Sequence, residues 1–350
     1  MRYKFYTKSE KAWLAMLEDI KRAKKSIYIE SFILTEDPIT KDFFDVLKQK
    51  AREGLKVKII VDKFADFWYG SINKEEFKQA GAEILFFNRW WLYRTHRKIL
   101  IIDEEIAFLG GVNVSGQYAK WLDLHLRITG ILAKNLLHSF TRIYKLSGGK
   151  DNAVIGLQKG KKIFRAHAAL YRAKTWLIER WPIKGKSELK KYYKRKIKEA
   201  QSKITIVTPY FFPHRWLVKA LKEAARRGVK IEVIVPEHTD VWLTNIAHRV
   251  FVKSFSKIIN FFFIREMIHA KVLLIDDQEG LVGSNNIDAQ SFDFNLEAAV
   301  VFQRKDMIGD LKKILERWKK ESIPGEIVNH YQHWYHRFIG LFIRFFQPIL

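Results

Sequence analysis

The 350-residue sequence predicts an α/β protein made of two tandem copies of one domain. Two observations lead to this prediction. Residues 20–62 and 197–236 share one pattern of charged, apolar and glycine positions, and residues 96–113 and 269–286 share another. The members of each pair lie about the same distance apart along the chain, so the chain is a duplication with small insertions.

The first segment of each copy predicts a strand–helix–strand unit. It runs from the end of a helix through an alternating strand, a loop and an amphipathic helix to a glycine and an apolar strand. Gly54 and Gly228 lie where a helix C-cap is expected, directly before that second strand. Because two strands joined through a helix run parallel, each copy should contain a mixed, largely parallel sheet flanked by helices.

The second segment of each copy predicts a hairpin that completes the sheet. The apolar runs at 99–102 and 272–275 indicate buried strands, and each is followed by an acidic turn and another short apolar stretch. The sequence predicts a first domain over 1–148, a connector over 149–190, a second domain over 191–321 and a tail over 322–350.

Composition limits the partners of the protein. The formal net charge is +25, which favours a polyanion such as an anionic membrane, a phosphate-bearing substrate or a nucleic acid. The 11 Trp, 13 Tyr and 26 Phe suit a membrane interface, although aromatic rings also stack on single-stranded bases. There are no cysteines, which excludes disulfides and thiolate metal sites, and we expect neither a signal peptide nor a membrane-spanning segment.

Each copy carries the motif His-x-Lys-x4-Asp-x6-Gly, followed by an asparagine at matching spacing. Its members are His96, Lys98, Asp103, Gly110 and Asn113 in the first copy, and His269, Lys271, Asp276, Gly283 and Asn286 in the second. Residues two apart on a strand face the same side, so each copy should present an imidazole beside an ammonium. Packing the copies with pseudo-twofold symmetry would bring both sets around one shared active site.

Such a site suits phosphodiester chemistry without a metal or a cofactor. One neutral histidine can attack phosphorus and form a covalent intermediate, while the other protonates the leaving alcohol. The lysines and asparagine amides can stabilise the charge that develops on the phosphoryl oxygens. A structural role in turns is the alternative for the asparagines, with function favoured.

The paired motifs resemble those of the phospholipase D superfamily, and further stretches resemble its bacterial cardiolipin synthase branch. These stretches are 121–125, 208–213, 225–229, 235–240 and 291–297, and the resemblance covers roughly residues 10–145 and 190–320. It implies a phosphohistidine intermediate, with His96 as nucleophile and His269 as general acid by analogy, although the nearly symmetric halves leave this open. Gln290 before Ser291, where the family often has Arg, puts the substrate preference in doubt.

Several other residues are expected to support the site. Asp103 and Asp276 lie at the far end of the strand from the lysines, so structural support or orientation of the opposite histidine is favoured over direct chemistry. Glu297 and Asp123 occupy corresponding places after each motif, where they could orient a catalytic histidine or be ordinary strand-end carboxylates. The motif glycines Gly110 and Gly283, with Ser284 where the first copy has Gly111, complete the predicted support.

Two aromatic segments are expected to touch lipid. Trp90 and Trp91 run into the first motif beside arginines and could form a lipid-dipping rim, with core packing as the alternative. In the tail, helical spacing predicts an in-plane amphipathic anchor formed by Trp334, Phe338, Phe342 and Phe345, with docking on the protein's own core as the alternative.

The resemblance implies a phosphatidyltransferase that forms cardiolipin from two phosphatidylglycerols and releases glycerol. A peripheral (monotopic) position on the cytoplasmic face of the cell membrane is expected, with an anionic phospholipid membrane as partner and no nucleic acid favoured. Two alternatives remain at this point: hydrolysis to phosphatidic acid, and a nuclease, because the charge of +25 also suits a phosphate backbone. The sequence leaves the oligomeric state open.

Overall fold

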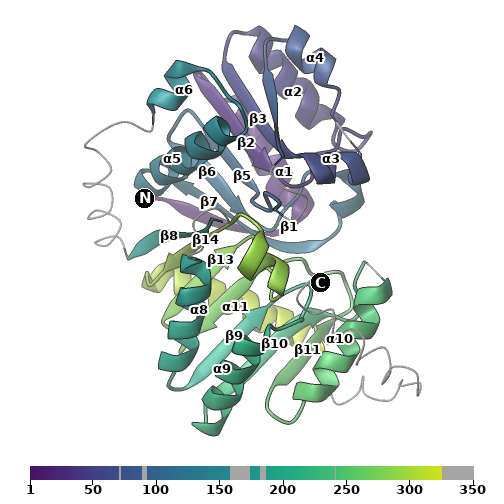
Figure 1. The fold of residues 1–350 in the computed structure, drawn as a ribbon, viewed down its shortest axis with the longest axis vertical. Coiled ribbons are helices and arrows are strands. Elements are labelled where there is room, and N and C mark those ends of the chain that lie inside the picture. The colour runs from purple at the N-terminus through teal and green to yellow at the C-terminus, as the bar shows by residue number, and fades with distance from the viewer. Residues whose placement is uncertain (71, 89–92, 158–173, 182–186, 241, 325–350) are drawn as a thin grey trace.

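The chain forms two lobes, each built on one mixed β-sheet with helices on its faces (Figure 1). The computed structural model describes residues 1–324 except 71, 89–92, 158–173, 182–186 and 241. The two mixed sheets with helices on their faces confirm the predicted α/β class and the predicted duplication. The predicted lipid-contacting residues Trp90, Trp91, Trp334, Phe338, Phe342 and Phe345 lie outside the described residues.

The first lobe contains a seven-stranded sheet in the order β1-β7-β6-β5-β2-β3-β4. Its strands are β1 (Tyr3–Lys8), β2 (Ser26–Ser31), β3 (Lys56–Asp62), β4 (Glu83–Phe87), β5 (Ile99–Ile102), β6 (Ile106–Gly110) and β7 (Leu122–Thr129). Its helices are α1 (Ser9–Lys21), α2 (Lys41–Arg52), α3 (Lys63–Tyr69), α4 (Lys74–Gln79), α5 (Ile131–Leu146) and α6 (Asn152–Gly156), with a 3-10 turn at Gly116–Tyr118.

The second lobe contains an eight-stranded sheet in the order β15-β11-β10-β9-β12-β13-β14-β8. Its strands are β8 (Thr175–Arg180), β9 (Lys203–Val207), β10 (Lys230–Pro236), β11 (Asn260–Ile264), β12 (Val272–Ile275), β13 (Glu279–Gly283), β14 (Glu297–Phe302) and β15 (Ile323–Pro324). Its helices are α8 (Glu188–Glu199), α9 (Arg215–Arg226), α10 (Trp242–Phe255) and α11 (Lys305–Lys320), with a π-helical turn at Gln290–Phe294.

Matching strands occupy matching positions in the two sheets. Among the strands described above, those that pair in parallel are β2, β3 and β4 in the first sheet and β9, β10 and β11 in the second. The other strands pair antiparallel, because the strand after each motif turns back as a hairpin. The sheets are thus mixed as predicted, with a smaller parallel part than expected. Gly54 and Gly228 adopt φ values of +88° and +85°, as the predicted helix ends require.

Each repeat also has an edge strand that the sequence comparison did not detect. β1 pairs with β7, and β8 pairs with β14, in both cases antiparallel. Each of these strands leads into a helix and then into the first parallel strand of its sheet. β8 comes from within the predicted connector 149–190, so part of that segment belongs to the second sheet. The domain boundaries otherwise stay a prediction.

One hydrophobic core joins the two lobes. It contains Leu126 and Phe140 from the first lobe together with Val272, Val300 and Trp318 from the second, all of them buried. Continuous packing of this kind places the inner strands of the two sheets against one another, as the centre of Figure 1 shows. None of the helices in the described part of the chain is long and apolar enough to cross a bilayer.

Candidate active site

The two motif histidines lie just before strands and at the junction of the lobes. His96 and Lys98 precede β5, and His269 and Lys271 precede β12, so the motifs occupy extended segments rather than the strands themselves. The backbone N–H of His96 donates to the Leu296 carbonyl at 3.0 Å, a bond that crosses between the lobes. Its counterpart is the bond from the His269 N–H to the Leu122 carbonyl at 2.7 Å.

Side chains alternate along these segments as the sequence predicted. Arg97 points away from the cavity that His96 lines and is buried, donating to Glu30 at 3.0 Å through Nε and to Glu179 at 2.6 Å through Nη1. Because Glu30 lies on β2 and Glu179 on β8, this buried ion pair ties the first motif to both sheets. Lys98 Nζ donates back to the His96 carbonyl at 2.7 Å.

Each histidine is hydrogen-bonded to a carboxylate from the opposite lobe. His96 Nδ1 lies 3.0 Å from Oε1 of Glu297, and His269 Nδ1 lies 3.0 Å from Oδ2 of Asp123. Glu297 is the first residue of β14 and Asp123 the second of β7. The carboxylates assign the proton to Nδ1 of both rings, which leaves Nε2 of each as the nitrogen available for chemistry. This geometry places Glu297 and Asp123 in the orienting role, one of the two possibilities open from sequence.

The two histidine–carboxylate pairs differ in the carboxylate, which is glutamate in one and aspartate in the other, and in the groups around it. Ser284 Oγ donates a short hydrogen bond to Glu297 Oε2. At the matching position of the first lobe, a Cβ on Gly111 would lie 2.2 Å from Asp123 Oδ1, so only glycine fits there. His269 Nδ1 also lies 3.1 Å from the Gly111 carbonyl. The duplication has therefore kept both pairs and changed what surrounds each carboxylate.

Both histidines are neutral at pH 7. Burial lowers the pKa of His96 to about 4 and that of His269 to about 3, and the neighbouring lysine in each motif acts in the same direction. Burial alone would raise the carboxylate values, yet the histidine contacts hold the pKa of both Glu297 and Asp123 below the usual range. Each pair is therefore an ionised carboxylate beside a neutral imidazole.

The motif lysines are fully buried and repel each other. Burial lowers the pKa of Lys271 to about 8. The pKa of Lys98 lies well below its ordinary value, first through burial and then through the charge of Lys271. An anion beside these buried groups would favour their charged form by replacing the lost solvation, and a phosphate group is such an anion.

Both histidines line one cavity of about 500 Å³ between the lobes. Asn113 and Asn286 line it as well. Asn113 Oδ1 accepts from the Ile33 N–H at 3.4 Å, whereas Asn286 Oδ1 is buried and has no hydrogen-bond partner among the described residues. The amide of Asn286 is thus positioned by its neighbours and still has capacity for a ligand.

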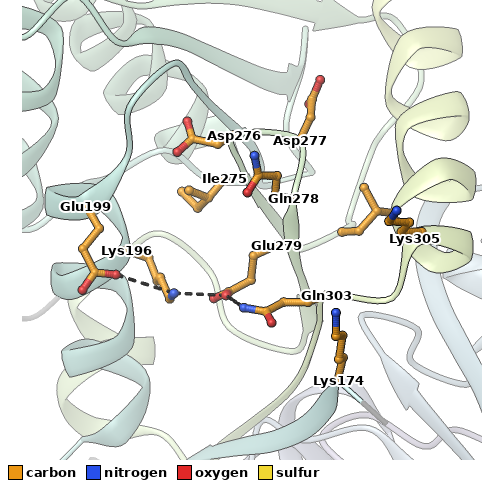
Figure 2. Close-up of a pocket in the computed structure, with 11 residues that line it drawn as sticks. Lys174, Lys196, Glu199, Ile275, Asp276, Asp277, Gln278, Glu279, Gln303 and Lys305 are labelled. Atoms are coloured by element: carbon orange, nitrogen blue, oxygen red, sulfur yellow. Dashed lines mark hydrogen bonds and ion pairs between the residues drawn. The ribbon is translucent and has the colours of Figure 1, made fainter. Parts of the chain in front are cut away.

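Asp103 and Asp276, which are also candidates for the catalytic set, do not line this cavity, so a catalytic role for them stays a prediction that this geometry does not favour. Asp103 accepts backbone hydrogen bonds from Lys24, Lys25 and Ser26, and Asp276 accepts them from the matching residues 201–203. Figure 2 shows Asp276 beside a separate cavity of about 600 Å³, where Lys196 bridges Glu199 and Glu279. Both aspartates stabilise the fold, as their distance from the lysines indicated.

The motif glycines support the sheets by close packing. A Cβ on Gly110 would lie 2.3 Å from the Leu124 carbonyl oxygen of β7, and one on Gly283 would lie 2.5 Å from Ala299 Cβ of β14. Any side chain at these positions would push away the strand that carries Asp123 or Glu297.

Sequence reasoning gave the residues of the cavity wall no role, although Trp121, Tyr210 and Asp240 lie in the stretches that carry the family resemblance. Phe32 packs edge-on against His96 with ring centroids 5.0 Å apart, and Trp121 lies 5.5 Å from His269. Tyr210 donates to Asp240 at 2.5 Å, and both line the cavity. Phe32 and Tyr210 follow the first parallel strand of their sheets, the edge where ligands bind in α/β proteins. Their place just after a predicted strand was the signal by which the sequence could have identified them as wall residues.

Within the described residues, no three His, Asp or Glu side chains come together as a set of metal ligands.

Two lobes of one topology, each with a motif histidine that lines the shared cavity and pairs with a carboxylate of the other lobe, are the arrangement of a phosphatidyltransferase-type enzyme of the phospholipase D superfamily. The chain belongs to the family described as cardiolipin synthase, PLD-like domain, which it matches over residues 16–128 and 193–319.

Curated relatives and a solved structure agree with this placement. The chain is 28% identical to a probable cardiolipin synthase of Bacillus subtilis, covering 92% of this chain and 67% of the relative. It is also 28% identical to a cardiolipin synthase of Clostridium perfringens, covering 89% and 71%. The fold is similar to that of Haemophilus influenzae phosphatidylserine synthase, with a TM-score of 0.77, 16% identity, and coverage of 99% of this chain and 93% of the other.

Proposed function

We propose that the protein transfers a phosphatidyl group from one phosphatidylglycerol to another, forming cardiolipin and releasing glycerol. One observation carries the proposal: two neutral histidines, each oriented by a carboxylate of the opposite lobe, line a single cavity, and a buried lysine lies two residues after each of them. The similarity to cardiolipin synthases selects the lipid chemistry.

In the first half-reaction, Nε2 of His96 attacks the phosphorus of the donor lipid. A P–N bond forms, the bond from phosphorus to the glycerol headgroup oxygen breaks, and His269 gives its proton to that oxygen. The free His269 is neutral, so it takes up this proton from water when the negative phosphodiester enters and offsets the charge of the lysines. Lys98, Lys271 and the two asparagine amides stabilise the phosphoryl oxygens.

In the second half-reaction, the headgroup of a second phosphatidylglycerol enters the space that glycerol has left. His269 takes the proton of its primary hydroxyl, the oxygen attacks phosphorus, and the P–N bond to His96 breaks. Asp240 and Tyr210 in the cavity wall provide a carboxylate and a phenol that suit a polyol headgroup. The aromatic side chains of the wall favour this alcohol over water as the acceptor.

The protein would work as a peripheral enzyme at an anionic membrane on the cytoplasmic side of the cell. The formal net charge of +25 supports this location, since each basic residue near an anionic surface contributes about 1 kcal/mol.

The test is to incubate the purified protein with phosphatidylglycerol vesicles and to follow the lipids and glycerol by mass spectrometry. Cardiolipin and glycerol in equal amounts are expected, with neither formed by His96→Ala or His269→Ala. Phosphatidic acid as the sole product would show a hydrolase instead. Unchanged lipid together with cleavage of single-stranded DNA or RNA would show a nuclease.

A further inference from the structure

We infer that α3 is the element that docks the protein onto an anionic phospholipid bilayer and sets the cavity mouth at the lipid surface. This inference rests on the proposed function, because it takes a membrane lipid as the substrate. The seven-residue helix carries Phe64, Phe67, Trp68 and Tyr69, whose side chains are 41%, 79%, 65% and 46% exposed. Leu14 and Ile39 are the other large hydrophobic residues with comparable exposure in the described part of the chain.

The exposed rings form one face of a well-held helix. Phe64, Phe67 and Trp68 follow the spacing i, i+3, i+4, and their rings contact one another with centroids 5.8 Å and 5.6 Å apart. Asp62 caps the helix by accepting from the Phe64 and Ala65 N–H groups, and Ala65 itself is buried. An aromatic face that the fold holds in place and that is nevertheless exposed to water indicates an interaction site.

The cap also connects α3 to the catalytic segment. The second oxygen of Asp62 accepts from the Thr95 N–H at 2.8 Å, and Thr95 is the residue before His96. Farther along the helix, Lys74 Nζ forms an ion pair with Asp66 at 3.0 Å. At its end, Thr35 Oγ1 donates a hydrogen bond to the Tyr69 carbonyl at 3.3 Å. The helix therefore holds a fixed position relative to the nucleophile.

The aromatic face is continuous with the cavity. Phe64 and Tyr69 line the cavity, and Tyr69 contacts Phe32, which in turn packs on His96. The Arg94 guanidinium lies 4.0 Å from the Phe64 ring centroid and also lines the cavity. A phospholipid whose glycerol backbone lies at the level of α3 has its phosphodiester at the entrance to the histidines.

A bilayer fits this surface better than a protein does. Aromatic rings beside basic side chains match the headgroup region of an anionic membrane. A second copy, or another segment of this chain, seated across Phe64 and Tyr69 would cover the mouth through which lipid must enter. The occupant is therefore the membrane that supplies the substrate.

The first test uses the absence of cysteine from the sequence. Phe67→Cys and Trp68→Cys are each labelled with an environment-sensitive fluorophore, with Leu14→Cys as the matched exposed control on α1. Vesicles containing phosphatidylglycerol should shift the emission of both α3 labels to the blue and leave the Leu14 label unchanged; vesicles of phosphatidylcholine alone should act weakly. The inference is overturned if the α3 labels do not respond, or if they are already shielded without vesicles.

The second test separates docking from catalysis. In the double variant Phe67→Ser, Trp68→Ser, the initial rate on vesicle phosphatidylglycerol should fall about tenfold. The rate on monomeric short-chain phosphatidylglycerol should be unchanged, because that substrate reaches the cavity from solution. An equal loss on both substrates would mean that α3 serves the fold, which refutes docking. If the parent protein transfers neither lipid, the proposed function fails, and the fluorescence result still decides the docking.

Discussion

Each of the two histidines belongs to the same motif and has its own orienting carboxylate, and the groups that contact the two carboxylates differ. At His96, one oxygen of Glu297 receives the Ser284 hydroxyl, while at His269 the carboxylate of Asp123 fills the space beside Gly111. Asp123 Oδ1 instead accepts from the Leu124 N–H at 2.6 Å, so a side-chain hydroxyl supports one carboxylate and a backbone amide supports the other. The exchanges of glycine for serine and of aspartate for glutamate therefore give the two histidines different surroundings, as a division into nucleophile and acid would require.

The first prediction concerns Glu297 at this residue scale. Glu297→Gln removes the negative charge that orients the His96 ring and stabilises the positive charge that develops on attack. The kcat for transfer should fall by about a hundredfold or more, with little change in KM. Steady-state kinetics on short-chain phosphatidylglycerol measures both.

The matched control for this prediction is Glu279→Gln. Glu279 is also a buried carboxylate, but it lies at the separate cavity, where it accepts from Tyr192 at 2.6 Å. Its variant should retain the parent kcat. A Glu297→Gln enzyme that works within twofold of the parent would refute the orienting role.

The second prediction concerns the pH dependence set by Lys271. Its pKa is lowered to about 8, so the side chain is charged below that pH and neutral above it. Since the charge attracts the phosphodiester, whose own charge is constant in this range, kcat/KM should fall about tenfold between pH 7 and pH 9. Lys271→Arg keeps its charge and should lose this alkaline decrease. A decrease that persists in that variant would belong to another group.

At the scale of elements, the motif aspartates explain how each hairpin begins. Asp103 and Glu104 both have positive φ, as do Asp276 and Asp277, and the N–H after each pair donates back to the strand before it. These are two-residue turns of the primed type, in which aspartate tolerates the left-handed conformation. The carboxylate then caps the start of the neighbouring parallel strand. The motif aspartate thus sets the register between β2 and β5, or between β9 and β12.

The third prediction follows from this turn. Asp103→Ala leaves three backbone N–H groups without their acceptor and should lower the free energy of unfolding by about 1–3 kcal/mol. Glu104→Ala is the control, because it changes the neighbouring left-handed residue without removing a cap. Chemical denaturation measures the difference, and kcat should stay near the parent value in both. A large loss of kcat in a fully folded Asp103→Ala protein would return this residue to the active site.

The elements and residues that sequence reasoning reached are those that local spacing determines. The doubled His-x-Lys spacing identifies both half-sites because alternation along an extended chain fixes side-chain direction. It did not decide between Glu297 and Asp103 as the orienting group, because the choice depends on how β14 packs against the other lobe. β8 was missed because an edge strand has only one partner and its segment contains no repeat signal. α3 was missed because seven residues are too few for helical periodicity to stand out.

At the scale of the molecule, the lobes share their core and their catalytic pairs, so they should unfold together. The prediction is that Leu47→Ala in α2, which lies in the first lobe's own core, lowers the opening free energy of amides in β10 as much as in β3. A loss of about 2–5 kcal/mol is expected from the cavity it creates. Native-state hydrogen exchange measures it residue by residue. A change confined to the first lobe would show that the lobes unfold independently.

Because each lobe supplies the carboxylate for the other lobe's histidine, joining the lobes in one chain affects how assembly of the site depends on protein concentration. Neither repeat contains a complete histidine–carboxylate pair, so two separate repeats would form the site only when they met in solution, and its occupancy would depend on protein concentration. Joining them in one chain makes that encounter intramolecular, at an effective concentration far above that of any enzyme in a cell. The catalytic pairs of this protein therefore stay assembled however low its concentration is.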